Sequence, residues 1–471
     1  MNNINFSNID LILIFGYLSA VLLLGFLAGR KKPEDDEAFL LAGRKLTLSG
    51  FVATLVVTWY GGILGIGEYS YQYGISTVVV FGIPFYIFSM IFGTFLAGKI
   101  REAGSITIPD RLYENFGRNT GIFGSVLIFI ISSPAPYVLM VAIILQLIFG
   151  WSFIFAIIVG ALLSALYVYL GGFNAVVITD KLQFLLMFGG FVLLLFFAVS
   201  EHGGLGLLFS SLPEDYLTWH GGNSFGYVFV WFFIALWTMI DPAFHQRCAA
   251  AKNPATAKKG IFISIGFWFL FDIMTITSGL YARMLLPGID PVQAYPLLAE
   301  MILPPIAKGL FFIGILSVIM STVDSLTLIS GATIGRDLIW RLKNNLTESS
   351  TYYSKVGIFI TLLSAIFIAY LIPSVIGIWY TFGSVLIPAL LLPVMSTYFP
   401  RYRLNGEQTF IVMVTGFVLS LLQLSAGYML GSLAEPMYPL TIEPIFPGLL
   451  ATFLLFFLFN LKNNREPSRS S

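Results

Sequence analysis

Apolar stretches long enough to cross a membrane recur along almost the whole chain. A membrane-spanning helix needs about 20 predominantly apolar residues, and charged or Pro-, Gly- and Asn-rich segments separate stretches of that kind throughout this sequence. The pattern predicts an all-α membrane protein with about 13 transmembrane helices. The predicted helices cover residues 9–29, 47–73, 75–98, 122–149, 152–171, 174–199, 224–246, 259–285, 305–335, 353–373, 374–397, 408–431 and 442–461.

The basic residues sort to one side of this map. If the N-terminus lies outside, 23 of the 25 Lys and Arg residues fall in cytoplasmic loops or at cytoplasmic helix ends, and only Arg283 and Lys308 fall outside. Because cytoplasmic loops collect Lys and Arg, we predict an external N-terminus and a cytoplasmic C-terminus. No positive segment precedes the first apolar stretch, so we interpret it as a membrane helix rather than a cleavable signal peptide.

The composition argues against most soluble functions. The chain is 57% hydrophobic and only 10% charged, whereas soluble domains carry about 25% charged residues. Its 25 basic and 24 acidic residues form no basic stripe, so we expect no nucleic-acid partner. The single cysteine, Cys248, excludes a disulfide framework, and no Cys/His cluster has zinc-binding spacing. We find no catalytic motif, so we predict that the protein is not an enzyme.

Five acidic residues fall within the predicted membrane helices: Glu68, Asp180, Asp241, Asp272 and Asp324. Each costs about 2.5–3.5 kcal/mol on insertion scales, and we expect no Lys or Arg near the midplane to pair with them. A path for cations is the interpretation that best offsets this cost. The alternative is that each acid caps a broken helix or accepts a hydrogen bond from a nearby Ser, Thr or Tyr.

Two segments combine flexibility with oxygen ligands. Residues 61–68 hold four glycines and Glu68, which indicates a helix that unwinds at mid-span, as in transporter sites where free carbonyls bind sodium. Small residues at a tight helix crossing are the alternative. The run 321–325 places three hydroxyls and a carboxylate within one and a half turns, and hard cations prefer such oxygens.

These features resemble the sodium:solute symporter family, which includes bacterial proline, pantothenate, sialic acid and sugar symporters. The most specific motif is the double-glycine run from Gly171 to Gln183, which ends in Thr-Asp-x-x-Gln. Three further pieces resemble family motifs: Phe39-Leu-Leu-Ala-Gly-Arg44, Gln246-Arg247 followed by Ala249-Ala-Ala-Lys252, and Met320-Ser321-Thr322 with Ser325. The resemblance implies the leucine-transporter fold in a bacterial inner membrane, with Na+ as the coupling ion.

The resemblance also implies a domain organisation. Two inverted five-helix repeats would lie at 47–199 and 224–397, each starting with a broken helix, and the break near Asp241 is the weaker candidate. The remaining parts would be an N-terminal peripheral helix and cytoplasmic loop (1–46), an extracellular loop (200–223), two peripheral helices (398–461) and a cytoplasmic tail (462–471).

The family's sodium site transfers to particular residues. Carbonyls would come from Leu55, Thr58 and Val318, and hydroxyls from Ser321 and Thr322. A second site found in some members would use three residues of this chain: Asp180, Ser321 and Ser325. Asp324 departs from the family pattern, which has a hydroxyl residue there, so an added cation site and a proton-dependent one both remain open.

The solute pocket should lie beside the break in the second helix. Its expected residues are Trp59, Tyr60, Glu68, Tyr137 and Trp379, although each aromatic has the alternative of plain helix packing. Polar positions of the family's sugar transporters are apolar or glycine here, at Val57 and Gly62, which disfavours a sugar. A pocket-facing Glu68 would favour an amine or a quaternary nitrogen.

The sequence therefore predicts a sodium-coupled symporter that imports a small organic solute by alternating access, such as an amino acid or another amine or carboxylate metabolite. Expected partners are the solute, sodium ions and the lipid bilayer, with no obligate protein partner evident. A transporter-like sensor with a signalling partner is one alternative, disfavoured because 462–471 is too short for a kinase or receiver domain. Proton coupling instead of sodium coupling is the other.

Overall fold

The computed structural model describes residues 4–30, 35–343, 349–432 and 436–465, and these ranges are helical with no strand. Residues 31–34 of the predicted N-terminal cytoplasmic loop and residues 466–471 of the predicted tail lie outside the described ranges. The α-helices are α1 (Asn8–Ala28), α2 (Asp36–Leu41), α3 (Leu48–Trp59), α4 (Ile63–Tyr73), α5 (Ile83–Phe95), α6 (Ala97–Ala103), α7 (Ile108–Phe116), α8 (Arg118–Ile131), α9 (Ala135–Phe149), α10 (Phe153–His202), α11 (Leu205–Ser211), α12 (Phe225–Ile234), α13 (Trp237–Ile240), α14 (Pro242–Ala250), α15 (Pro254–Leu285), α16 (Ala294–Ile302), α17 (Ala307–Ala332), α18 (Ser350–Leu371), α19 (Val375–Ser396), α20 (Gly406–Leu430) and α21 (Ile445–Arg465). Short 3-10 turns are η1 (Ala42–Arg44), η2 (Tyr60–Gly62), η4 (Glu214–Leu217), η5 (Pro291–Gln293), η7 (Pro400–Tyr402) and η8 (Pro439–Thr441), and π-helical turns are η3 (Val78–Gly82) and η6 (Thr333–Trp340).

Local caps begin several of these helices. Ser7, Thr107 and Asn405 each form a capping box, in which the cap and the third helical residue satisfy each other's backbone N–H groups. Proline ends others, because its ring lacks an N–H group and clashes with the preceding turn. The predicted helix 122–149 is therefore two helices, α8 and α9, separated at Ser132–Pro134.

The helix α10 contains two membrane crossings. Its 50 residues would extend about 75 Å at 1.5 Å per residue, far beyond a bilayer core of about 30 Å. The chain leaves helical geometry at Gly172, with φ 56° and ψ −146°. Both arms then run along α1 from the same end: Tyr167 packs on Gly25, and Gln183 donates to the Tyr17 hydroxyl (3.2 Å). Of the described helices, twelve are long and apolar enough to span, so this reversal confirms the prediction of about 13 crossings.

Gly172 is required at this reversal. Its φ is positive, and a Cβ there would come within 2.3 Å of the Phe39 backbone oxygen. We expect Gly172→Ala to lower the free energy of unfolding by about 1–3 kcal/mol, since an L-residue is strained in this backbone region. Gly189→Ala on the same helix is the matched control, because its Cβ would meet nothing within 4 Å. Thermal unfolding of the detergent-purified variants, followed by size-exclusion chromatography, measures the difference; equal stabilities would contradict it.

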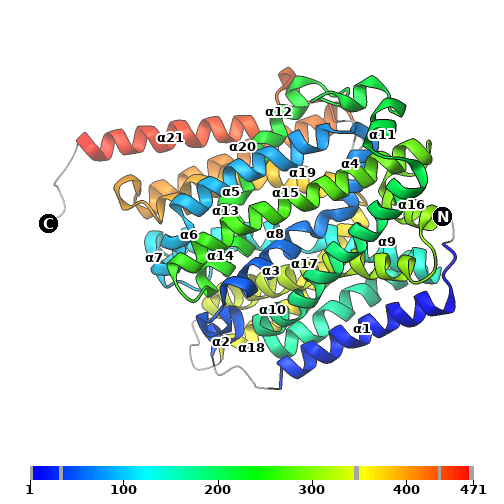
Figure 1. The fold of residues 1–471 in the computed structure, drawn as a ribbon. Helices are drawn as coiled ribbons and strands as arrows, with labels where there is room; N and C mark the ends of the chain where they lie inside the picture. Colours follow the sequence, from blue (N-terminus) through cyan, green and yellow to red (C-terminus); the bar gives the residue numbers. More distant parts are fainter. Residues whose placement is uncertain (1–3, 31–34, 344–348, 433–435, 466–471) are drawn as a thin grey trace.

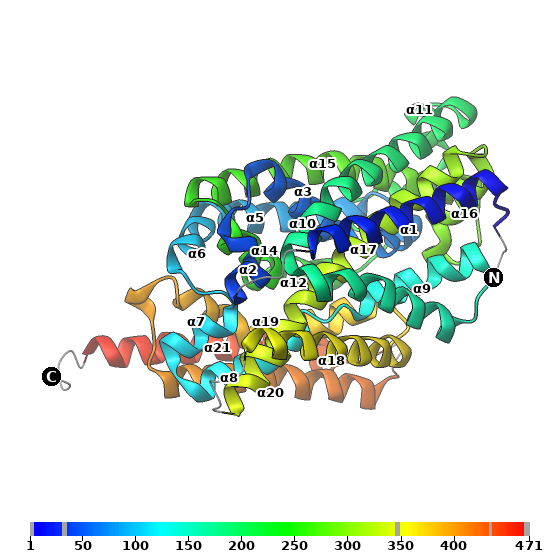
Figure 2. The ribbon, with the colours of Figure 1, turned by 90° about the horizontal axis from the view of Figure 1, so that it is seen from below.

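The helix bundle is built around α17. Its apolar window is 100% buried, whereas the windows of α1 and α21 are only 28% and 22% buried. Figure 1 shows α1 and the pair α20–α21 at opposite edges of the bundle, with α17 between them, and Figure 2, seen from below, shows α1 crossing in front of the bundle with α20 and α21 along its lower side. The large apolar side chains exposed on these outer helices suit contact with lipid.

Two further membrane runs among the described helices are broken, one at η2 and one at Asp241. The first run passes from α3 through the single 3-10 turn η2 to α4, as the glycine-rich segment predicts. Gly61 also packs against Thr322, where a Cβ would come within 2.0 Å of the hydroxyl oxygen, so the tight-crossing alternative holds as well. The expectation that the break near Asp241 is weaker is wrong. Asp241 is extended (ψ 118°) between α13 and α14, because the following Pro242 disfavours helical geometry at the residue before it.

Candidate functional site

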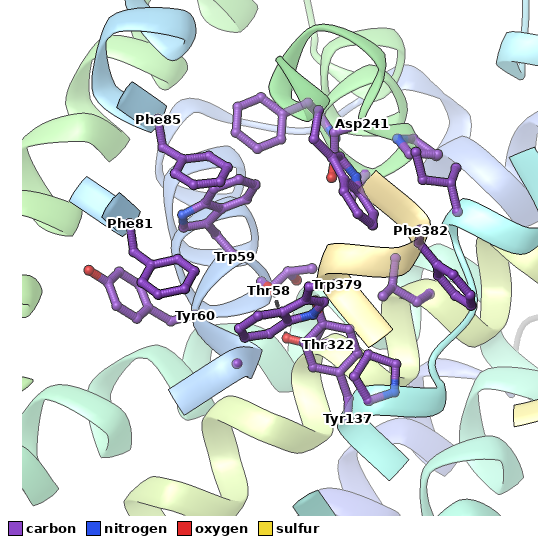
Figure 3. Close-up of a pocket in the computed structure, with 18 of the residues that line it drawn as sticks. Thr58, Trp59, Tyr60, Phe81, Phe85, Tyr137, Asp241, Thr322, Trp379 and Phe382 are labelled. Atoms are coloured by element: carbon purple, nitrogen blue, oxygen red, sulfur yellow. Dashed lines mark hydrogen bonds between the residues drawn. The ribbon is translucent and has the colours of Figure 1, made fainter. Parts of the chain in front are cut away.

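A cavity lies between the two broken helices and four other helices, which are α9, α15, α17 and α19 (Figure 3). About 1110 Å³ of empty space lies within it, a figure that includes the part open to solvent. Its lining residues come from helices and turns that are far apart in the sequence: Leu55, Thr58, Trp59, Tyr60, Gly62, Ile66, Phe81, Phe85, Ile131, Ser133, Pro136, Tyr137, Trp231, Ile234, Trp237, Asp241, Pro242, Ala243, Phe244, Asp272, Thr322, Leu326, Trp379 and Phe382.

Four of the five residues predicted to contact solute line this cavity: Trp59, Tyr60, Tyr137 and Trp379. Glu68 does not line it, so its expected place in the pocket is wrong. The physical reason is helical rotation: Ile66 on α4 faces the cavity, and two residues at about 100° each turn the Glu68 side chain away from it. Because α4 is a regular helix from Ile63 onward, the rotation of about 100° per residue applies between Ile66 and Glu68.

The acids that do line the cavity are Asp241 and Asp272. Asp241 Oδ1 accepts from the Phe244 amide (2.9 Å) and caps α14. The Asp272 carboxylate accepts hydrogen bonds from the hydroxyls of Tyr60 and Tyr86, one on each oxygen. The sequence analysis identified both acids as lying in the membrane but gave them no role in the pocket. What it lacked was the direction in which their helices face.

Most of the predicted sodium ligands meet where α3 crosses α17. The Thr322 hydroxyl donates to the Thr58 carbonyl oxygen (2.6 Å) and to the Val318 carbonyl oxygen (3.3 Å). Leu55, one turn earlier on α3, is 1% exposed and lines the same cavity. The close approach depends on Gly61, whose missing side chain makes room for Thr322. Thr58 and Thr322 also line the cavity, so this helix crossing borders it.

A second buried polar cluster adjoins the first one. The Ser321 hydroxyl donates to Asp180 Oδ1 (2.6 Å), and Thr54 donates to the other carboxylate oxygen. The Thr58 hydroxyl lies 3.2 Å from that of Ser321 and 3.1 Å from that of Ser325. The residues predicted for the second site, Asp180, Ser321 and Ser325, are thus close together.

Arg247 is the residue of this cluster that the sequence analysis missed. The expectation that no basic residue pairs with the membrane acids is wrong, because Arg247 is fully buried with its Nη2 3.9 Å from Asp180 Oδ2. Its Nη2 also donates to three hydroxyl oxygens, those of Ser325 (2.6 Å), Thr58 (2.9 Å) and Thr54 (3.0 Å).

Arg247 reaches the core because α14 restarts after the break at Asp241 and is buried along its whole length. The signal in the sequence is the Gln246–Arg247 motif, whose arginine counts among the 23 basic residues predicted on the cytoplasmic side.

Asp324 faces a different neighbour. Its carboxylate accepts from the Tyr167 hydroxyl on the first arm of α10, and its Oδ1 has no hydrogen-bond partner among the described residues. Asp324 is fully buried. Its hydrogen bond therefore links α17 to α10 rather than to the hydroxyls around Asp180.

An ion-pair cluster joins α2, α7 and η6 at the end of the bundle opposite the N-terminus. Arg336 contacts Asp36 (2.9 Å), Asp110 (3.1 Å) and Asp337, and Arg341 also contacts Asp110. Burial raises the pKa of the Asp110 carboxyl, but the two guanidinium groups outweigh it and hold that pKa below its usual value. This cluster closes that end of the bundle with paired charges.

Comparison with known proteins gives consistent likenesses. Residues 39–416 match the sodium:solute symporter family. The chain is 25% identical to a sodium/pantothenate symporter of Haemophilus influenzae, over 87% of this chain and 89% of that protein. It is 27% identical to high-affinity choline transporter 1 of Drosophila melanogaster, over 85% and 68%.

Among solved structures, the fold is similar to that of a Na+-coupled sialic acid symporter, with a TM-score of 0.79, 16% identity and 98% of each chain covered. It is also similar to that of a nucleobase-cation-symport-1 family transporter, with a TM-score of 0.61, 12% identity and coverage of 92% and 96%.

Proposed function

We propose, because this chain belongs to the sodium:solute symporter family, that it imports a small organic solute together with sodium through the cavity between its two broken helices. The family makes the chain a sodium-coupled transporter and not an enzyme. The leucine-transporter fold implied by the sequence motifs is confirmed by the likeness to solved transporters. The proposal concerns which residues hold the ion, which hold the solute and how the chain is oriented.

The contact between Thr322 and the Thr58 carbonyl carries the sodium assignment. It brings hydroxyl and carbonyl oxygens from α3 and α17 together at a helix break, and such oxygens are the ligands that sodium takes in broken-helix transporters. We assign the carbonyls of Leu55, Thr58 and Val318 and the hydroxyls of Ser321 and Thr322 to the transported ion. An ion bound there would hold α3 against α17.

The solute and the ion would share part of their binding surface. Thr58 and Thr322 line the solute cavity and also belong to the ion cluster. When either the ion or the solute orders these two residues, the entropic cost of binding the other ligand falls. Coupling between the two ligands requires this reciprocity. Both repeats, 47–199 and 224–397, would contribute, since each begins with one of the broken helices.

We orient the N-terminus outside and the C-terminus in the cytoplasm of the bacterial inner membrane. The support is the sorting of 23 of 25 basic residues to one side. In this orientation the ion-pair cluster around Arg336 lies at the cytoplasmic end and seals it. The cavity would then load from outside.

The solute is a small organic metabolite. Relatives of the chain are named for pantothenate, choline and glucose, so solutes of different charge are compatible with this fold. An amino acid or another amine or carboxylate metabolite fits the cavity's size, and the apolar residues at Val57 and Gly62 argue against a sugar.

Uptake by proteoliposomes tests the proposal. A pooled metabolite library is offered under an inward sodium gradient and a negative internal potential, and accumulated solutes are identified by mass spectrometry. One charge crossing about 100 mV supplies about 2.3 kcal/mol, and a tenfold sodium gradient adds about 1.4 kcal/mol. We therefore expect accumulation of up to a few hundred-fold that disappears when an ionophore collapses the sodium gradient. Uptake that survives this treatment and follows a proton gradient would support proton coupling instead.

A further inference from the structure

The charged residues that line the cavity are all acidic. Among its lining residues are two carboxylates, Asp241 and Asp272, and no Lys, Arg or His. The basic residues nearest along the chain to Asp241 are His245, whose ring contacts the Met239 carbonyl oxygen and the Tyr398 hydroxyl, and Arg247, which donates to Thr58 and pairs with Asp180. The two lining carboxylates therefore have no basic counterpart within the cavity wall.

The walls of the cavity are aromatic. The Trp59 ring lies 5.2 Å from the rings of both Phe85 and Phe244, centroid to centroid. Figure 3 shows Trp59, Phe81 and Phe85 on one side of the space, with Asp241 and Phe382 on the other. Ring faces attract cations, and tryptophan does so most strongly.

Trp379 completes this aromatic enclosure from α19. Its ring lies 6.2 Å from that of Phe81 and 6.3 Å from that of Tyr137. It fits against the broken helix only because residue 62 is glycine, where a Cβ would come within 2.1 Å of the indole. The glycine that disfavours a sugar thus makes room for an additional ring face.

An anionic solute would find no basic side chain among the lining residues. The beginning of α14 faces the cavity and would otherwise attract an anion through its free amide groups. Asp241 already accepts from the Phe244 amide at that end, so an incoming carboxylate would approach a carboxylate. The Tyr60 and Tyr86 hydroxyls are also occupied, since both donate to Asp272.

We infer that the solute is an organic cation, whose ammonium group is held between the Trp59 ring and the Asp241 carboxylate inside the aromatic enclosure formed with Phe85, Phe244 and Trp379. This inference rests on the proposed function, because it takes the cavity to be the transport site. A primary amine or a quaternary ammonium group satisfies it, and a carboxylate or a sugar does not. Asp272 supplies the second carboxylate of the cavity.

Binding of choline and of its uncharged carbon isostere, dimethylbutanol, tests the charge directly. The two molecules have the same shape, so a difference in affinity measures attraction to the positive charge alone. With sodium present, we expect choline to bind at least about tenfold more tightly than the isostere, as measured by titration calorimetry on the purified protein. Tetramethylammonium should compete with choline.

Two variants locate the ammonium group. Asp241→Asn keeps the helix cap, because asparagine caps helices as well as aspartate, and should weaken choline binding at least about tenfold without affecting the isostere. Trp59→Leu should weaken choline more than Trp59→Phe, which retains a ring face. Glu214→Gln, which removes a carboxylate from an exposed loop, is the control and should leave choline affinity unchanged.

The outcomes separate this inference from the proposed function. It is overturned if dimethylbutanol binds as tightly as choline, if Asp241→Asn binds choline normally, or if neither choline nor tetramethylammonium binds at millimolar concentrations. Sodium-driven uptake of pantothenate or glucose, with no cation bound, would reject the organic cation and retain the symporter. Choline binding that depends on Asp241, with uptake indifferent to sodium, would retain the site and reject the coupling.

Discussion

Replacing Thr322 with valine should raise the sodium concentration needed for half-maximal uptake by about 10- to 100-fold, since a hydrogen-bonding group that contacts an ion contributes about 1.5–3 kcal/mol. Valine retains the shape of threonine, so the packing of Thr322 against Gly61 remains. Only the hydroxyl that reaches the Thr58 carbonyl is lost. Uptake measured over a range of sodium concentrations gives the shift.

Thr327→Val is the matched control for this experiment. Thr327 lies on the same helix and is fully buried, and its hydroxyl has no hydrogen-bond partner among the described residues. The same chemical change there should leave sodium dependence unaltered. If Thr322→Val and Thr327→Val show the same sodium dependence, the assignment of the ion to the crossing of α3 and α17 is wrong.

Removing the guanidinium of Arg247 should destabilise the protein by about 3–5 kcal/mol, the usual cost of leaving one member of a buried ion pair without its partner. In Arg247→Met the Asp180 carboxylate stays fully buried without its cation. Arg247→Lys keeps a charge but loses the planar fork that reaches three hydroxyls, so it should fall between the wild type and Arg247→Met.

A double variant distinguishes charge pairing from simple packing. Because Asp180→Asn removes the uncompensated charge, Arg247→Met combined with Asp180→Asn should unfold at a higher temperature than Arg247→Met alone. Thermal unfolding in detergent measures all four proteins of the cycle. Additive losses from the two substitutions would show that the pair contributes no coupling and would contradict this account of Arg247.

The pair of Arg247 and Asp180 also affects the predicted second sodium site. The Arg247 guanidinium already donates to the hydroxyls of Thr58 and Ser325 and faces Asp180. The positively charged Arg247 side chain therefore lies in the cluster where the sequence motif predicts a second sodium ion. The Thr322 site remains the one that we assign to the transported ion.

The hydroxyl cluster on α17 was predictable from sequence because it depends on local spacing. Ser321 and Thr322 follow Val318 by three and four residues, and Ser325 follows them by four and three, so a helix places these residues on one face without reference to the rest of the fold. The glycines around Gly61 likewise indicate where α3 ends. Both features followed from residues that are neighbours in the chain.

The pocket carboxylates were not predictable in the same way. Glu68, Asp241 and Asp272 look equivalent in sequence, as acids within apolar helices. Only the rotation of α4 turns Glu68 away from the cavity, and only the extended backbone at Asp241 directs α14 into the core. Such rotations depend on single dihedral angles, which hydropathy does not report.

The sequence by itself determined that the chain is helical, spans a membrane about 13 times, belongs among sodium:solute symporters and carries a cluster of hydroxyl oxygens on one helix. The family follows from its motifs, and the other properties follow from composition and short-range periodicity. The tertiary structure alone decided that Arg247 neutralises Asp180 and that Asp241, rather than Glu68, faces the aromatic cavity. The physical reason is distance along the chain: Arg247 meets Thr54 across 193 residues, and only the packing of broken helices brings such residues together.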